Sequence, residues 1–328
     1  MRLLLIRDHR VDVPNRPGAG KMITNLPSGS SSFQHDLLAK GLSELGHEVI
    51  CFVPEGLNMI PIPEVKSVNN LITDIDLVHL KAPGNREIIA YYEEKNIPVL
   101  ETSHGFRPEI VPPCKRVYVS KTQAEMHNSD DYIWNGLDPA DFIYTSEKRN
   151  YFLFIATIQN LKGKGLDIAL RLSKELGFKL IVAGSSKLQK DIDAVQALCS
   201  LHEASYVGDV RGKEKAELIT GAKALLSPSR LPETFGITLA EALFSGTPVI
   251  CSDNGAYGEI MSPEVSFVCR DESDYRIAFR DIEKIDTETC RAYALKHFHY
   301  LNTAEKYVEI YTEMMSSTTR KLMYEIAE

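Results

Sequence analysis

The sequence has no long hydrophobic run and no paired cysteines. No stretch reaches the roughly 18–20 consecutive apolar residues that a membrane-spanning helix needs, and the apolar run after Arg2 ends at Ile6, shorter than a signal-peptide core. The six cysteines are scattered, with no C-x-x-C pair and no zinc-ligand spacing. These absences predict a cytoplasmic protein without disulfides, whose contact with a membrane is at most peripheral.

An excess of basic residues is also missing. The chain has 37 basic and 45 acidic residues, a net charge of −8, and neither half is basic. This balance excludes a general nucleic-acid binder, which needs cations to replace phosphate counterions. Metal-binding patterns are scarce too, since no histidines follow H-E-x-x-H spacing. Asp74-Ile75-Asp76 directly precedes the strand expected at 77–80, as the polar lead-in to a buried strand does, so we expect no metal site there.

What the sequence does contain is a regular alternation of short apolar runs and helical patterns. This alternation over 328 residues, with 44% hydrophobic residues, predicts an α/β fold with two doubly wound, Rossmann-like domains. A polar stretch at 135–150 interrupts the pattern. We therefore expect an N-terminal domain at 1–145, a C-terminal domain at 146–305, and a final helix at 306–328 that packs back on the N-terminal domain. The expected strands are 2–6, 47–53, 77–80, 98–101, 116–120, 151–156, 179–183, 204–207, 224–227 and 248–251.

The most informative segment is 228–242, which leaves a strand and enters a helix. Glu233 lies in the loop before the helix and Glu241 about one turn inside it. The free N–H groups at the helix start favour an anion such as a diphosphate. Two carboxylates oppose an anion, so they fit hydroxyl groups better. A nucleotide sugar has both groups, and doubly wound sheets bind ligands at the carboxyl ends of their strands. We expect the functional cleft between the two domains.

The spacing of these glutamates resembles the hallmark of retaining GT-B glycosyltransferases of family 4. Phe235-Gly236 follows Glu233 at the family's spacing, and the surrounding residues also match. Gly29 precedes Gly46-His47-Glu48-Val49 as the family's N-terminal glycine loop precedes its next strand. The other matches are Pro228-Ser229, Ala242, Gly246-Thr247-Pro248-Val249-Ile250, Gly255 to Ile260, His104-Gly105 and Asn135-Gly136-Leu137-Asp138 with Phe142.

The resemblance implies transfer of a sugar from a nucleoside diphosphate sugar to a carbohydrate, lipid-linked or small-molecule acceptor, in polysaccharide or glycoconjugate biosynthesis. The anomeric configuration would be kept in a front-face reaction without metal, cofactor or enzyme nucleophile. Glu233 and His104 would be the catalytic residues, and Glu241 would hold the ribose hydroxyls. The implied donor-binding residues are Gly29, Lys162, Lys164, Thr234, Phe235, Gly236, Ile237 and Glu241.

One position departs from the family. Where relatives carry an arginine that neutralises the diphosphate, this chain has Thr157. The doubled Lys-Gly pairs at 162–165 suggest that Lys162 and Lys164 together supply the charge, from one flexible loop. Two alternatives stay open: an epimerase of the same fold acting on a nucleotide sugar, and a catalytically silent binding subunit.

Overall fold

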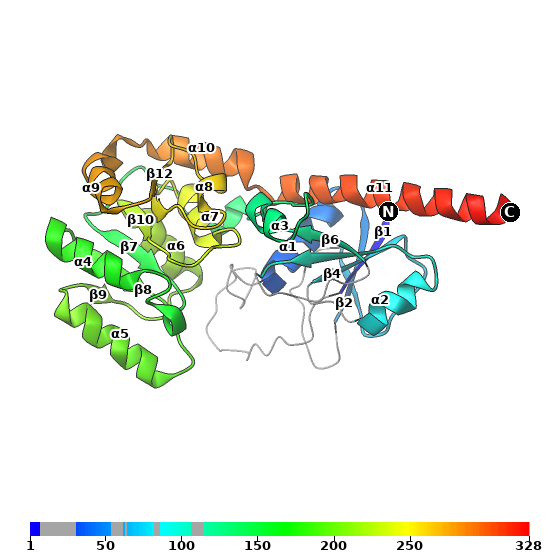
Figure 1. The fold of residues 1–328 in the computed structure, drawn as a ribbon, viewed down its shortest axis with the longest axis horizontal. Helices are drawn as coiled ribbons and strands as arrows, with labels where there is room; N and C mark the ends of the chain where they lie inside the picture. The colour runs from blue at the N-terminus through cyan, green and yellow to red at the C-terminus, as the bar shows by residue number, and fades with distance from the viewer. Residues whose placement is uncertain (7–30, 54–61, 63, 82–85, 106–113, 328) are drawn as a thin grey trace. The chain divides into compact units, whose positions relative to one another are not determined.

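The computed structural model describes residues 1–6, 31–53, 62, 64–81, 86–105 and 114–327, with side chains as far as 318. These residues form two compact units. The first unit comprises Met1–Asp138 together with Phe298–Glu328, and the second unit is Pro139–His297. Figure 1 labels most of the helices and strands of both units. No helix in the described part of the chain is long and apolar enough to cross a membrane.

The first unit is a six-stranded parallel sheet in the order β3-β2-β1-β4-β5-β6. This is the strand order of the doubly wound fold. The central strands are buried on both faces, which explains the apolar run of β1. The neighbouring strands β4 and β5 are buried as well, and they carry the polar side chains of His79 and Glu101 into the interior. The elements are β1 (Arg2–Ile6), α1 (Ser31–Glu44), β2 (Glu48–Phe52), β3 (Lys66–Val68), β4 (Leu77–Lys81), α2 (Arg86–Glu93), β5 (Val99–Ser103), β6 (Lys115–Tyr118), α3 (Lys121–Met126) and α11 (Tyr300–Ala327).

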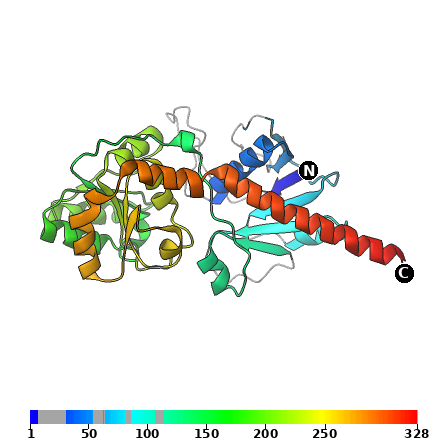
Figure 2. The same cartoon turned by 90° about the horizontal axis from the view of Figure 1, so that it is seen from above.

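The last helix, α11, completes the first unit. Both ribbon views show α11 running alongside α1 (Figures 1 and 2). Its buried Tyr307 and Tyr311 join a core cluster with Leu3 and Leu38. The final segment of the chain therefore supplies part of the interior of the first unit.

The second unit is also a six-stranded parallel sheet, in the order β12-β11-β10-β7-β8-β9. If β7 is counted as the first strand of this unit, the order read from β9 to β12 is 3-2-1-4-5-6, as in the first unit. The elements are η1 (Pro139–Asp141), β7 (Phe152–Ile155), η2 (Ile158–Asn160), α4 (Leu166–Leu176), β8 (Leu180–Ala183), α5 (Gln189–Leu201), β9 (Ser205–Tyr206), α6 (Gly212–Gly221), β10 (Ala224–Ser227), α7 (Ile237–Phe244), β11 (Val249–Ser252), α8 (Tyr257–Ile260), β12 (Ser266–Cys269), α9 (Glu272–Asp281), η3 (Ile282–Lys284) and α10 (Thr287–His297).

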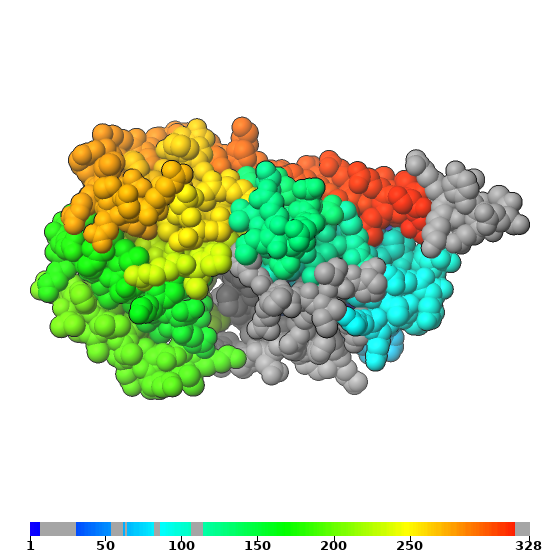
Figure 3. Space-filling model, viewed as in Figure 1, coloured from blue at the N-terminus to red at the C-terminus, as the bar shows by residue number. Residues whose placement is uncertain are grey.

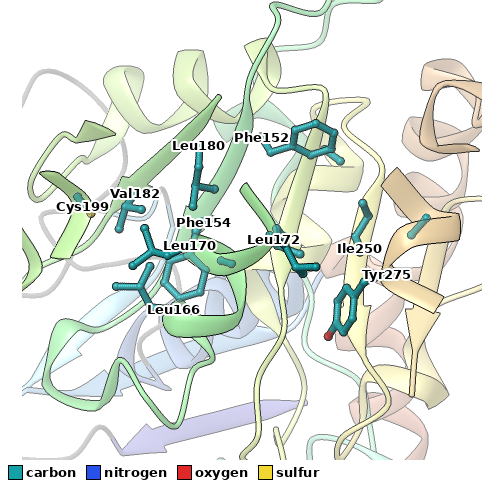
Figure 4. Close-up of a cluster of buried hydrophobic side chains, with 14 of the residues drawn as sticks. Phe152, Phe154, Leu166, Leu170, Leu172, Leu180, Val182, Cys199, Ile250 and Tyr275 are labelled. Atoms are coloured by element: carbon teal, nitrogen blue, oxygen red, sulfur yellow. The ribbon is translucent and has the colours of Figure 1, made fainter. Parts of the chain in front are cut away.

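A large core cluster of the second unit lies between its sheet and the helices α4, α5 and α9. Phe152 and Phe154 of β7 pack with Leu166 and Leu170 of α4 in one buried cluster (Figure 4). In the space-filling view, the segments from α4 to α10 of this unit are coloured green through orange (Figure 3). The expected α/β class with parallel sheets is confirmed.

Both boundaries between the units lie earlier in the sequence than expected. We expected 145 and 305, whereas the structure changes unit after Asp138 and after His297. The reason is local packing. Leu137 N–H donates to the carbonyl of Phe298 within the first unit. Phe142 instead stacks on Phe244 in the second unit, with ring centroids 5.2 Å apart.

A half-buried lysine holds the C-terminal ends of two helices in the second unit. Lys148 Nζ donates to the carbonyls of Thr220 in α6 (2.9 Å) and Ser245 at the end of α7 (3.2 Å), and to Thr247 Oγ1 (3.0 Å). A cation at these carbonyls complements both helix dipoles. Burial lowers the pKa of Lys148 to about 8. The contact fixes the far end of α7, whose other end carries the site described next.

Candidate functional site

The strand order of the second unit predicts a ligand site at two loops, those after β7 and β10. β7 and β10 are neighbours, and their connections leave in opposite directions along the sheet. Ligands of doubly wound folds bind at this switch point, outside the carboxyl ends of the strands. Here the loop after β7 contains Thr157, Lys162 and Lys164, and the loop after β10 contains Glu233. Residues that lie far apart in sequence are therefore neighbours at one edge of the sheet.

Lys164 and Glu233 form an ion pair between the two loops. Lys164 Nζ lies 2.7 Å from Glu233 Oε1 and 2.9 Å from Oε2, so the lysine contacts both carboxylate oxygens. Ser229 Oγ donates a further hydrogen bond to Glu233 Oε1 at 2.7 Å. The side chains are 29% exposed for Lys164 and 15% exposed for Glu233, so both retain access to solvent. The pair places one cation and one hydroxyl acceptor at the switch point.

Glycines allow the loops to approach each other this closely. Gly165 has φ +80°, and a Cβ there would lie 1.9 Å from the carbonyl oxygen of Pro228. Gly255 has φ +66°, and a Cβ there would lie 2.2 Å from the backbone N of Glu233. Ala256 N–H donates to the Glu233 carbonyl at 2.8 Å. The Glu233 backbone is thus fixed by the loop after β11.

The start of α7 lies directly after Glu233. Gly236 is the N-cap residue with φ +112°, a conformation that side chains rarely adopt. Phe235 is buried and anchors the turn, while Thr234 and Ile237 are half-buried. The first N–H groups of a helix have no partner within the helix, and they carry its positive dipole end. Three features of an anion site therefore coincide: a lysine, a glycine and a helix start.

Glu241 has a different environment. Its side chain is 1% exposed and pairs with Lys215 of α6, with Nζ–oxygen distances of 2.8 and 2.6 Å. A ligand can meet this carboxylate only after neighbouring atoms move. The motif did not point to Lys215, because Lys213-Glu214-Lys215 resembles an ordinary solvated helix surface.

Hydrogen bonds connect the lysine loop, residues 157–165 after β7, to the loop after β10. Thr157 is exposed and precedes η2. Lys162 is exposed as well, and its carbonyl accepts a hydrogen bond from Arg230 Nη1 at 2.8 Å. Arg230 also pairs with Asp167 through two hydrogen bonds of 2.6 and 2.7 Å. Sequence reasoning missed Arg230, because only the fold brings it to the loop that follows β7.

In the first unit, His104 directly follows β5. It lines a cavity of about 20 Å³ together with Thr102, Tyr307, Gln34 and Asn135, among others. Burial lowers the pKa of His104 to about 3, and the charge of Lys81 contributes in the same direction. His104 is therefore neutral at physiological pH. Gly29, the remaining expected donor-binding residue, lies outside the described residues.

A buried polar network lies beside this cavity. His79 shares hydrogen bonds with Tyr311 Oη (2.6 Å, through Nδ1) and with Thr102 Oγ1 (2.7 Å, through Nε2). Thr102 Oγ1 also lies 2.7 Å from Tyr307 Oη. Burial lowers the pKa of His79 to about 3, aided by His104. The network ties β4 and β5 to α11, next to the wall that holds His104.

The structure thus brings together most of the predicted site residues of the second unit. Lys164, Glu233 and the start of α7 share one edge of the sheet, whereas the Lys162 side chain is exposed and Glu241 is buried. Among the described residues, no three histidine, cysteine or acidic side chains are grouped in a way that could hold a metal ion.

The segment that contains this geometry matches a known family. Residues 140–291 match the family model of the glycosyl transferases group 1. The match covers nearly all of the second unit and includes Lys164, Glu233 and Glu241. It identifies the second unit as related to glycosyltransferases.

Curated relatives agree with the family match. The O-antigen chain mannosyltransferase RfbU of Salmonella typhimurium is 28% identical over 193 residues, 53% of this chain and 53% of that protein. The D-rhamnosyltransferase WbpZ of Pseudomonas aeruginosa is 31% identical over 106 residues, 32% of this chain and 27% of that protein. The chain therefore spans about half the length of these relatives or less.

Solved structures resemble the whole chain. AviGT4, a glycosyltransferase involved in avilamycin A biosynthesis, has a TM-score of 0.76 at 23% identity, covering 96% of this chain and 98% of that chain. Anabaena Alr3699/HepE in complex with UDP has a TM-score of 0.69 at 13% identity, covering 95% and 100%. At these identities the likeness shows the fold. Both units are Rossmann-like, as in GT-B glycosyltransferases.

Proposed function

We propose that this protein is a retaining GT-B glycosyltransferase of family 4, which moves a sugar from a nucleoside diphosphate sugar to an acceptor hydroxyl. The observation that carries the proposal is the Lys164–Glu233 pair at the switch point of the second unit, beside the start of α7. This pair lies within the segment that matches the glycosyltransferase family. One side of the pair suits a phosphate and the other suits sugar hydroxyls.

In the proposed reaction, the difficult step is departure of the diphosphate. Lys164 and the amide groups of Phe235, Gly236 and Ile237 would stabilise the charge that develops on this leaving group. Preorganised donors of this kind need no reorganisation during the reaction. Glu233 would accept hydrogen bonds from sugar hydroxyls, because each carboxylate has about four lone-pair sites and Lys164 and Ser229 do not use all of them. His104, neutral at its low pKa, would act near the reacting sugar as a hydrogen-bonding group.

The finer parts of the proposal have separate support. A nucleotide-sugar donor is favoured because Alr3699/HepE has been solved with UDP and with UDP-glucose. A hexose is favoured because the curated relatives transfer mannose and rhamnose. We further propose a reaction without metal or cofactor in the cytoplasm, in polysaccharide or glycoconjugate biosynthesis. Glu241 would bind ribose hydroxyls after the atoms that bury its carboxylate move aside.

Incubation with a panel of UDP-, GDP-, ADP- and dTDP-sugars in the presence of EDTA tests the proposal. Slow release of free sugar with its anomeric configuration kept, followed by NMR, is the expected result. Epimer interconversion would instead identify an epimerase, and binding without turnover of any donor would identify a silent subunit. Glu233→Gln should retain nucleotide binding and lose most turnover, whereas Glu264→Gln, outside the site, should keep both.

A further inference from the structure

Arg230 ties the loop after β10 to the loop after β7. Its backbone N–H donates to the carbonyl of Gly163 at 2.8 Å. Its guanidinium Nη1 donates to the carbonyl of Lys162 at 2.8 Å. These two carbonyls belong to the residues that directly precede Lys164, so the backbone is fixed where it turns toward the ion pair with Glu233.

The same guanidinium also reaches the first turn of α4. Nη1 and Nη2 donate to the two carboxylate oxygens of Asp167 at 2.6 and 2.7 Å. The hydrogen bonds from Arg230 lower the pKa of Asp167, and those to Asp167 raise the pKa of Arg230. A planar guanidinium can contact a carboxylate with two parallel bonds and a carbonyl at once, whereas an ammonium group cannot reproduce this geometry.

Close packing leaves the lysine loop little room beside β10. Gly165 touches Pro228 so closely that a Cβ would lie 1.9 Å from its carbonyl oxygen. Ser229, the next residue, donates to Glu233. Its own carbonyl accepts hydrogen bonds of 2.6 Å from both Ser252 and Asn254. The neighbours Ser229 and Arg230 therefore position one member each of the Lys164–Glu233 pair.

We propose that Arg230 is a positioning residue for the donor diphosphate, acting through the loop that carries Lys164. The inference rests on the proposed function and goes beyond it by assigning a role to a residue outside the glutamate motif. The guanidinium of Arg230 donates to Asp167 and to the Lys162 carbonyl. Arg230 would therefore affect a ligand by fixing the position of Lys164. Because Thr157 is uncharged, the site depends strongly on the placement of this lysine.

The test compares affinities for a nucleoside diphosphate and for its parent nucleoside by calorimetry. The probe is whichever of UDP, GDP, ADP and dTDP binds the 328-residue chain most tightly. Arg230→Met should weaken diphosphate binding about tenfold, the size of one charge-assisted hydrogen bond, and change nucleoside binding less than about twofold. Arg230→Lys should not restore the affinity, because one ammonium cannot hold both Asp167 and the carbonyl.

Asp167→Asn supplies a second route, since it weakens the same contact while leaving Arg230 in place. It should show a smaller loss confined to the diphosphate, and the double variant should lose no more than Arg230→Met alone. Arg280→Met is the matched control, because Arg280 forms a comparable two-bond pair with Asp281 on the surface at the end of α9. It should bind both probes like the wild type.

Three results would overturn the inference. Unchanged diphosphate affinity in Arg230→Met and Asp167→Asn would show that the loop holds Lys164 without help. Equal losses for diphosphate and nucleoside would show that Arg230 only maintains the fold. A wild-type protein that does not prefer the diphosphate to the nucleoside would overturn the proposed function as well, which distinguishes the two failures.

Discussion

His79 uses both ring nitrogens inside the first unit and is fully buried. The pKa of His79 is about 3 in the folded protein, against 6.5 for an ordinary histidine. Between these values the unfolded chain binds a proton that the folded chain does not. Stability should therefore fall as pH falls from 6.5 toward 3, by about 1.4 kcal/mol per pH unit for this group.

His79→Gln, which keeps a hydrogen-bonding side chain, should remove this part of the acid sensitivity. The measurement is the free energy of unfolding in urea at several pH values between 7 and 4. His104 also has a pKa of about 3 and adds a second, similar contribution, so His104→Gln gives the comparison. Parallel pH profiles for the wild type and His79→Gln would contradict the prediction.

Lys215 and Glu241 form a nearly buried ion pair. Removing only the lysine leaves a carboxylate that is 1% exposed without its cation, so Lys215→Met should cost about 3 kcal/mol of stability. Lys215→Met combined with Glu241→Met should recover much of this loss, because an apolar pair fills a similar volume. Lys213→Met on the same helix is the control, since Lys213 is 80% exposed and should cost less than about 1 kcal/mol. Additive losses in the double variant would show that the two residues are not coupled.

At the scale of elements, the start of α4 is set by Gly165 and its end by Gly177. Both have positive φ, +80° and +68°, but only Gly165 meets backbone atoms, while no atom lies within 4 Å of a Cβ at Gly177. Gly177→Ala should therefore cost only the conformational penalty of about 1–2 kcal/mol. Gly165→Ala adds a clash with Pro228, so it should cost more and weaken diphosphate binding. Urea unfolding and calorimetry test both, and equal costs would refute the role of the clash.

The elements that the sequence predicted best are the buried strands. The run Tyr151 to Ala156 is continuously apolar because β7 is covered on both faces, and such runs are easily recognised. The edge strands β3 and β12 were missed, since Lys66 and Ser67 of β3 are exposed and β12 is only partly buried. Each of these two strands has one neighbouring strand, and β3 in particular lacks an apolar pattern.

The sequence indicated candidate residues for a site, but it did not indicate which side chains pair with one another. The glutamate motif and the Lys-Gly repeat placed Glu233 and Lys164 in loops after strands, and parallel topology explains why they meet. Two salt bridges join helices and loops that are distant in sequence. One pairs Lys215 with Glu241, and the other pairs Arg230 with Asp167. Local patterns do not contain such pairings, because they depend on side-chain reach across the completed sheet.

In the whole molecule, one unit is built from a single segment of the sequence and the other from two segments. The second unit is a single stretch, Pro139–His297, whereas the first needs residues from both ends of the sequence. Residues 139–297 expressed alone should therefore unfold cooperatively in urea, followed by circular dichroism. Residues 1–138 alone lack Tyr307 and Tyr311 from their core and should not. A cooperative transition in the 1–138 fragment would contradict this expectation.

The place of α11 in the first unit also has a consequence during protein synthesis. Domains commonly fold in the order in which the ribosome releases them. Here that order is inverted, because the second unit is fully translated before Tyr307 and Tyr311 exist to cover Leu3 and Leu38. The nascent chain then carries a finished second unit and an unfinished first one with apolar surface exposed. Chaperones would act mainly on this earlier-made but later-folding half.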